Sequence, residues 1–291
     1  MNTRNIKTVI IILLAAANIF LLYNISELNR QVQNIPAGMI ADASDILRAW
    51  GIDADIKIIP ADKPVNYIYE GVIYNYHEIV KSFTGASDEQ ITDGGSTTPE
   101  GGMLFNIGEY KFWFADDMLI EINKADYTAD MFGGLDRADG PAGDEAGIII
   151  SGFLDRYAGQ DIRTGFEITG MRSDGDISAV RINQTVDGLY IAPHSAYIII
   201  DGGELKYFYG RWYFGTFARE YEMPLLDSVN ILFKSMEQDD IAGAGLGHMG
   251  KEYNILKQYG IDTFYFTPSW VISYDDGRVF SYDMITGIKN N

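Results

Sequence analysis

Nineteen consecutive residues without a charged side chain, Thr8–Ser26, lie close to the start of the chain. At about 1.5 Å per residue, a helix of this length spans roughly 28 Å, close to the hydrocarbon thickness of a bilayer. Arg4 and Lys7 precede the run, and positive flanks stay on the cytoplasmic side. We therefore expect residues 1–30 to form a cytoplasmic start and a single transmembrane anchor, with the rest of the chain outside the cell.

A cleaved signal peptide is the alternative interpretation of this segment. The triplet Ala15-Ala16-Ala17 offers the small residues that a signal peptidase needs. However, Ile19–Tyr23 extends the apolar run beyond that triplet, which makes it longer than the core of a signal peptide. The pattern favours an anchor that stays in the membrane. The chain has no cysteine, so a lipidated cysteine is excluded as the tether.

Asn18 lies one residue from the middle of the apolar run. A carboxamide in hydrocarbon needs a hydrogen-bond partner. Ala15 and Leu22 share its helical face, and Ala15 allows a second helix to approach closely. We predict a partner-binding membrane face of Ala15, Asn18 and Leu22; the alternative is that one asparagine is simply tolerated in an anchor.

The chain outside the anchor is strongly acidic. Residues 1–30 carry a net charge of +2, so the chain's net charge of −19 becomes −21 for the remainder. Nucleic acids and anionic lipid headgroups are bound by cationic surfaces, and this composition argues against both partners. Without cysteine there is no disulfide, so the outer part must be stabilised by burial.

Hydrophobic periodicity predicts an α+β fold. A helix over Met39–Trp50 should end at Gly51, and Asp88–Gly102 is expected to be a loop. Leu104–Ala115 and Met118–Ile122 are expected to form a hairpin that turns at Asp116-Asp117. Further helices are predicted at His77–Phe83, Glu145–Tyr157 and Leu225–Met236. Strands are predicted at Ile56–Pro60, Val65–Tyr76, Phe166–Met171, Ile177–Gln184, Ala196–Ile200, Leu205–Phe217, Thr263–Tyr274 and Arg278–Asp283, with turns at Asp174-Gly175, Asp187-Gly188, Gly202-Gly203 and Asp276-Gly277.

These elements suggest two antiparallel-sheet lobes with packed helices, following the transmembrane helix. The first lobe is expected at 37–125 and the second at 144–291. Between them, 126–143 reads as an acidic, glycine-rich linker. The eight-residue stretches Ile46–Asp53 and Ile255–Asp262 match at five positions. This internal similarity indicates either two related lobes or two helices that each end at a glycine; the spacing of the shared pieces favours two helices.

Three patterns resemble ligand sites, and we interpret each as structural. Gly245–Gly250 is a literal G-x-G-x-x-G, but Glu252 stands where a P-loop needs Ser or Thr, and too little chain follows for a dinucleotide fold. The three histidines lack zinc spacing, and the acidic groups do not match a calcium loop. We therefore expect no nucleotide, cofactor or metal and no enzyme activity. The residues concerned are His77, His194, His248, Asp136, Asp139, Asp144, Glu145, Asp174 and Asp176.

Several short motifs of the chain recur together in one known family. Near the N-terminus they are Asn18 before Ile19–Leu22, a helix ending in Gly51-Ile52, and Ile58-Ile59-Pro60. Near the C-terminus they are Pro268-Ser269-Trp270-Val271-Ile272, Asp276-Gly277, Tyr282 and Thr286-Gly287. In these motifs the chain resembles the YycH/YycI family of membrane-anchored regulators of the cell-wall sensor kinase WalK (YycG). The sequence departs from the family at Leu246-Gly247-His248, where tyrosine is common after Leu-Gly.

The resemblance implies a non-enzymatic regulator in a two-component system. Its partners would be a membrane sensor histidine kinase and a sister regulator, contacted through the membrane helix and the outer domain. It also implies a small PepSY-like unit at the C-terminal end. The structural motif closing that unit would comprise Gly51, Pro268, Trp270, Gly277, Tyr282, Thr286 and Gly287. Two alternatives remain open: a PepSY-like binding module or protease inhibitor, and a cell-wall enzyme with an unrecognised carboxylate site.

Overall fold

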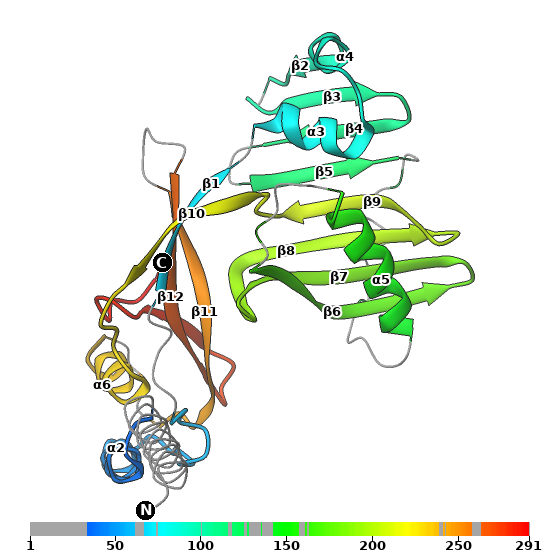
Figure 1. The fold of residues 1–291 in the computed structure, drawn as a ribbon. Coiled ribbons are helices and arrows are strands. Elements are labelled where there is room, and N and C mark those ends of the chain that lie inside the picture. Colours follow the sequence, from blue (N-terminus) through cyan, green and yellow to red (C-terminus); the bar gives the residue numbers. More distant parts are fainter. Residues whose placement is uncertain are drawn as a thin grey trace, which may run out of the picture. The chain divides into compact units, whose positions relative to one another are not determined.

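The computed structural model of the chain describes residues 34–61, 67–73, 75–99, 101–115, 118–124, 127, 135, 142–156, 161, 163–238, 241, 243–257 and 263–290. These residues form a mixed α+β structure with five helices and thirteen strands (Figure 1). The chain divides into two compact units. Unit 1 comprises Met1–Val65, Pro224–Gly250 and Trp270–Asn291, and unit 2 comprises Asn66–Met223 and Lys251–Ser269. The units interleave along the chain, whereas the predicted lobes at 37–125 and 144–291 are sequential.

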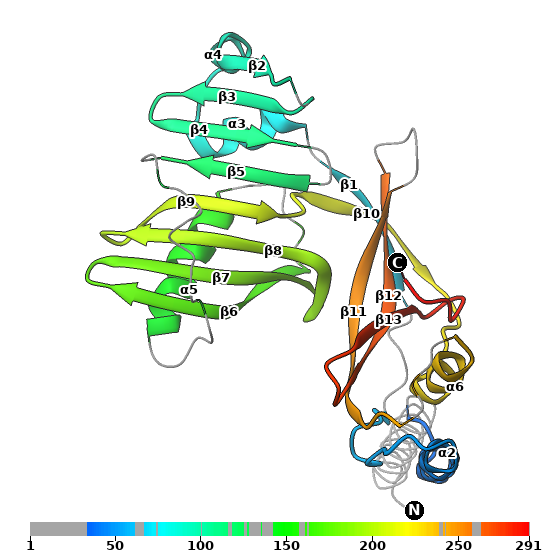
Figure 2. The ribbon, with the colours of Figure 1, turned by 180° about the vertical axis from the view of Figure 1, so that it is seen from behind.

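Unit 2 is built on a large sheet with helices on one face. Eight strands follow the spatial order β2-β3-β4-β5-β9-β8-β7-β6, and every neighbouring pair among them is antiparallel. Helices α3 and α5 lie in front of this sheet in Figure 1 and behind it in Figure 2. The bounds are β2 Gly95–Thr97, β3 Met103–Ile107, β4 Tyr110–Phe114, β5 Leu119–Asn123, β6 Thr164–Asp174, β7 Ile177–Val186, β8 Leu189–Asp201, β9 Glu204–Arg211, α3 Tyr76–Thr84, α4 Asp88–Gly94 and α5 Ala142–Leu154.

The core of unit 2 lies between this sheet and its helices. Alternate residues of each strand point to the same face, so Phe112, Ile198 and Phe208 all face the helices and are fully buried. From α3, Phe83 stacks on Phe153 of α5 with ring centroids 4.6 Å apart. The helices therefore cover one face of the sheet and leave the alternate residues on the opposite face.

Four further strands are β1 Tyr67–Ile73, β10 Gly215–Glu222, β11 Leu246–Lys257 and β12 Thr263–Tyr274. Strand β1 pairs with both β10 and β12 in antiparallel fashion. Strand β11 pairs with β8 in parallel, with Glu252 opposite Tyr190. This parallel pair departs from the purely antiparallel sheets predicted from the sequence, because the long chain segment between β8 and β11 lets β11 return in the same direction.

Unit 1 packs two helices against strands near the C-terminal end. It contains α2 Ala37–Ala49, α6 Ser228–Gln238 and β13 Val279–Asp283, together with the first part of β11 and the second part of β12. Its core includes Leu47 of α2, Leu232 of α6 and Trp270 of β12, all of them buried. Helix α2 ends where Gly51 adopts φ +81°, which confirms the predicted stop, since glycine tolerates the left-handed region.

Most of the predicted helices and glycine turns are confirmed, but the loop predicted at Asp88–Gly102 is wrong. Residues Asp88–Gly94 form α4, and Gly95–Thr97 form β2. Ser87 and Gln90 make a capping box: the Ser87 hydroxyl accepts from the Gln90 amide, and the Gln90 side chain accepts from the Ser87 amide. Ser-x-x-Gln is a helix-start signal, and the glycines and threonines that follow obscured it.

Three strand predictions are also corrected. The run Leu205–Phe217 is not one strand, because β9 ends at Arg211 and β10 begins at Gly215. The run Leu104–Ala115 is not one strand, because Gly108 turns the chain at φ +60° and separates β3 from β4. The run Ile56–Pro60 forms a turn, with the Ile58 amide donating to the Asp55 carbonyl. Alternation over a few apolar residues did not distinguish a turn from a strand.

The repeated stretch does not mark two helices. Ile46–Asp53 ends α2 as expected, but Ile255–Lys257 belong to strand β11. The rest of the second stretch lies outside the described residues. Similar sequences have thus taken different secondary structure, because the surrounding strands decide the conformation of a short segment.

The predicted anchor Thr8–Ser26 and most of the predicted linker 126–143 lie outside the described residues. Among the residues that are described, no helix is both long enough and apolar enough to cross a membrane.

Candidate functional site

The predicted membrane face of Ala15, Asn18 and Leu22 lies outside the described residues, so the structure gives no geometry for it. The seven residues of the predicted structural motif all lie within the described part of the chain. Six of its seven residues belong to unit 1, and Pro268 belongs to unit 2.

Trp270 and Tyr282 lie at the centre of unit 1. Both side chains are fully buried. The indole Nε1 of Trp270 donates to the Leu226 carbonyl at 2.9 Å, which ties strand β12 to the segment that leads into α6. A buried indole that is hydrogen-bonded contributes both apolar burial and orientation.

Thr286 and Gly287 form the turn that follows β13. The Asp283 carboxylate accepts hydrogen bonds from the amides of Ile285 and Thr286 and from the Thr286 hydroxyl, at 2.8–3.0 Å. Gly287 adopts φ +71°, and a Cβ there would lie 2.9 Å from Leu226 Cδ1. Gly277 likewise turns the chain between β12 and β13 at φ +85°. These residues therefore build the fold of unit 1.

The G-x-G-x-x-G at Gly245–Gly250 enters strand β11. The Gly245 amide donates to the Asp275 carboxylate at 2.9 Å, and Leu246–Gly250 are the first residues of the strand. A phosphate-binding loop needs a helix N-terminus directly after its glycines. A strand follows here instead, so the backbone lacks that geometry.

The three histidines are dispersed. His77 lies on α3 with its ring edge-on to Phe105, His194 is buried in β8, and His248 lies in β11. Burial, together with the charge of Arg211, lowers the pKa of His194 to about 3. Its ring Nδ1 lies 3.3 Å from Gln184 Oε1. Within the described part of the chain, no group of three His, Asp or Glu side chains is placed to hold a metal ion.

An open cavity of about 340 Å³ lies between α5 and the β6–β7 turn. Glu145 and Asp176 stand at its rim, and Ile149 and Met171 line its wall. Ser173 and Ser178 face each other there with hydroxyl oxygens 2.9 Å apart. The described lining holds carboxylates and hydroxyls but no histidine, lysine or cysteine that would activate a nucleophile.

The face of the unit 2 sheet opposite the helices carries the most distinctive surface chemistry. A single row of neighbours crosses five strands: Arg181 pairs with Tyr197, Tyr197 with Tyr209, Tyr209 with Glu121, and Glu121 with Trp113. We call these five residues the cross-strand row. At about 4.8 Å between strands, the row is roughly 19 Å long. All five side chains are half-buried, and Figure 2 views the sheet from this side.

Two arginines of this face, Arg181 and Arg211, differ from Arg163, which also belongs to unit 2. Arg163 is bound by Asp161 and Glu220 at 3.1 and 2.9 Å and lies over the Tyr69 ring; its hydrogen bond to Asp161 raises its pKa. In contrast, neither Arg181 of the row nor Arg211, two residues beyond Tyr209, forms an ion pair with any described residue. Their charge is therefore available on the surface of an acidic chain.

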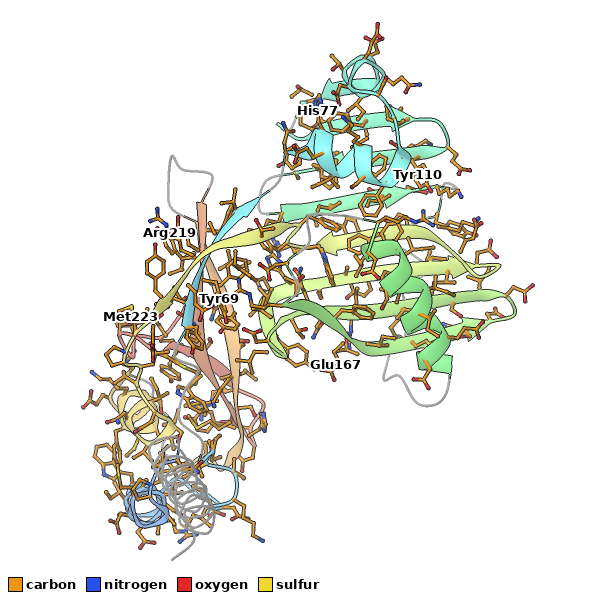
Figure 3. All side chains as sticks on the ribbon, viewed as in Figure 1. Tyr69, His77, Tyr110, Glu167, Arg219 and Met223 are labelled. Carbon is orange, nitrogen blue, oxygen red and sulfur yellow. The ribbon has the colours of Figure 1, made fainter. Side chains whose placement is uncertain are left out.

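The tyrosines of this face are arranged as a ladder along β9. The rings of Tyr207 and Tyr209 stack with centroids 6.4 Å apart. Burial and the nearby Glu121 carboxylate raise the pKa of Tyr207, so its hydroxyl stays protonated. Trp, Tyr and Arg are the residue types that dominate binding energy at protein interfaces. The row therefore forms a candidate surface for binding a partner, and Figure 3 draws its side chains with the rest of the molecule.

Sequence reasoning missed this surface. The signal was present in Tyr207-x-Tyr209-x-Arg211, where alternate residues of a predicted strand are large and amphipathic. Trp113 and Arg181 lie in the same row as Tyr209 only because of the register of the five strands. No protein-family model matches the sequence, and no curated protein matches it.

Proposed function

We propose that the chain is a membrane-anchored extracytoplasmic regulator that binds a membrane sensor histidine kinase and biases its signalling state. The anchor would hold the chain at the membrane through Ala15, Asn18 and Leu22, and the outer part would contact the kinase or a sister regulator. The resemblance to the YycH/YycI family supports the identity of the partner. The cross-strand row is the observation that carries the binding role.

The row fits a partner with acidic and aromatic side chains. Arg181 and Arg211 are cations without described counter-ions, and Arg binds carboxylates through two parallel hydrogen bonds. Trp113, Tyr197 and Tyr209 add broad amphipathic contact area at low entropic cost. Regulation requires that the partner's two states bind this surface differently. A difference of about 1.4 kcal/mol shifts the ratio of the two states tenfold.

The row and Arg211, which lies two residues beyond Tyr209 on the same strand, can be tested with two substitutions in the full-length chain. Tyr209→Ser and Arg211→Glu should each weaken co-purification of the kinase after crosslinking in intact cells, and the double variant should abolish it. Ile148→Ser is the matched control, because Ile148 is exposed on α5 on the opposite side of the sheet. Equal recovery of the kinase with all variants would rule out the row as its binding surface.

The membrane contact is tested separately by Asn18→Leu. We expect weaker association with the kinase and an outer part that unfolds at the same temperature as the wild type. Unchanged association and unchanged signalling in this variant would remove Asn18 from the proposal, while leaving the row to be judged by its own variants.

A further inference from the structure

Helix α2 carries an apolar stripe outside the core. Met39, Ile46 and Trp50 are 44, 43 and 62% exposed. Their spacing of seven and four residues places them within about 40° around the helix axis. We call these three residues the α2 stripe. Single exposed apolar residues are common on proteins, but here two on one side of a short helix and a third at its C-cap point to the same side.

The stripe is separate from the face that α2 uses for folding. Ile40, Ala43 and Leu47 are buried in the core of unit 1. These positions are centred roughly 70–80° around the helix from the stripe. The α2 stripe therefore extends the apolar side of the helix beyond what the core of unit 1 covers, and polar residues such as Asp45 and Arg48 occupy the remaining side.

The chain's own length restricts what the stripe can meet. Ten residues, 27–36, separate Ser26 from the first residue of α2. Fully extended, ten residues reach at most about 35 Å. In a chain anchored by Thr8–Ser26, α2 therefore stays close to the outer surface of the bilayer.

We infer that the α2 stripe docks on the outer surface of the lipid bilayer, with the Trp50 indole at the level of the headgroups. This inference rests on the proposed membrane anchor. Trp is favoured at the membrane–water interface because its ring is apolar and its N–H is polar. Met39 and Ile46 add apolar area that is removed from water, which is the main drive for interfacial helices.

The charge of α2 selects the kind of lipid. Asp42 and Asp45 outnumber the single cation Arg48 on this helix, so anionic headgroups oppose docking. Contact should be strongest on zwitterionic bilayers. Adding anionic lipid should weaken it at low ionic strength, and salt should restore it by screening.

The test uses the fluorescence of the full-length chain reconstituted in phosphatidylcholine vesicles, with and without lipids brominated on the acyl chains near the headgroup. Trp212 and Trp270 are fully buried in the protein, and Trp113 lies in unit 2. We expect brominated lipid to quench part of the wild-type emission and that part to be lost in Trp50→Phe. Met39→Ser with Ile46→Ser should reduce it, and Ile148→Ser should leave it unchanged.

Three results would overturn the inference. Quenching of the Trp50 fluorescence by aqueous iodide, and not by brominated lipid, would show that the α2 stripe faces water. Protection from both quenchers that rises with the ratio of protein to lipid would show that a second copy covers the stripe. Release of the chain from vesicles by alkaline carbonate would contradict the membrane anchor and with it the proposed function. Retention of the chain without quenching by brominated lipid would contradict the docking of the α2 stripe alone.

Discussion

The two units place a fully buried tryptophan in different chemical settings. In unit 1, the Trp270 indole donates to the Leu226 carbonyl. In unit 2, the Trp212 Nε1 is buried, and the described residues offer it no hydrogen-bond acceptor. The Trp270 hydrogen bond thus fixes β12 to the segment before α6, whereas Trp212 is held by aromatic packing such as its edge-on contact with Phe208 at 5.6 Å.

The same contrast extends to the residues that face water. In unit 1, Trp270 and Tyr282 fill the core, and Gly51, Gly277 and Gly287 allow the chain to turn. In unit 2, Arg181, Arg211 and the tyrosines of β9 take no part in the core between the sheet and its helices. The comparison teaches that Trp270, Tyr282 and the glycine turns serve the fold of unit 1, whereas the cross-strand row lies on a sheet face of unit 2 outside its core.

The largest expected effect is on unit 1. Trp270→Ala should lower the free energy of unfolding by roughly 3–5 kcal/mol, because it removes a fully buried indole and leaves a cavity. Trp50→Ala is the matched control in the same unit and should change it by less than about 0.5 kcal/mol. Urea denaturation of both variants measures the difference. Similar losses in the two variants would contradict the assignment of Trp270 to the core.

An acid-dependent loss of stability should arise in unit 2. Folded His194 has a pKa of about 3, and the unfolded imidazole titrates near 6.5. Between these values the unfolded chain binds the additional proton, so the free energy of unfolding falls as the pH is lowered. The contribution is fully present above pH 6.5 and falls by up to about 1.4 kcal/mol per pH unit below it.

The His194 contribution is isolated by comparing pH profiles. The free energy of unfolding of His194→Gln should depend less steeply on pH than that of the wild type between pH 6 and 4. Carboxylates titrate in this window in both proteins, so only the difference between the slopes counts. Equal slopes for the two proteins would show that His194 is protonated in the folded chain over the same pH range as in the unfolded chain. The protection factors of amides in β8, which correct for the slower intrinsic exchange at low pH, should also fall before those of α6 as the pH is lowered.

The smallest expected effect separates the two tryptophans directly. Trp270→Phe leaves the Leu226 carbonyl without its donor, whereas Trp212→Phe removes a donor that has no acceptor among the described residues. Losing a partner of a buried polar group costs about 1–3 kcal/mol, so Trp270→Phe should be more destabilising by roughly that amount. Denaturant midpoints measured on the two variants settle the order. The reverse order would contradict the difference in hydrogen bonding between the two tryptophans.

Local signals predicted much of the secondary structure. Glycine after an amphipathic run marked the end of α2 at Gly51, and Gly175, Gly188 and Gly202 marked the turns of the unit 2 meander. Helix α4 was missed because its capping box is followed by glycine and threonine. Strand β11 was missed because it begins in the glycine-rich Gly245–Gly250 and its last three residues repeat the end of α2; pairing with β8 and β12 makes it a strand.

The division into units and the candidate surface needed the structure. Unit 1 joins the residues before β1 to two later segments, which no local composition reveals. The cross-strand row depends on the register of five strands, and a shift of one residue would turn Tyr209 towards the helices. The predicted membrane face lies outside the described residues and stays a prediction.

Site-specific photocrosslinking from position 209 of the full-length chain, in intact cells, tests the central claim most directly. A photoreactive residue replaces Tyr209, and the captured protein is identified by mass spectrometry. A membrane sensor kinase or a sister regulator should be captured from position 209 and not from position 148. Equal capture from both positions, or no membrane protein from position 209, would contradict a regulator that binds through this face.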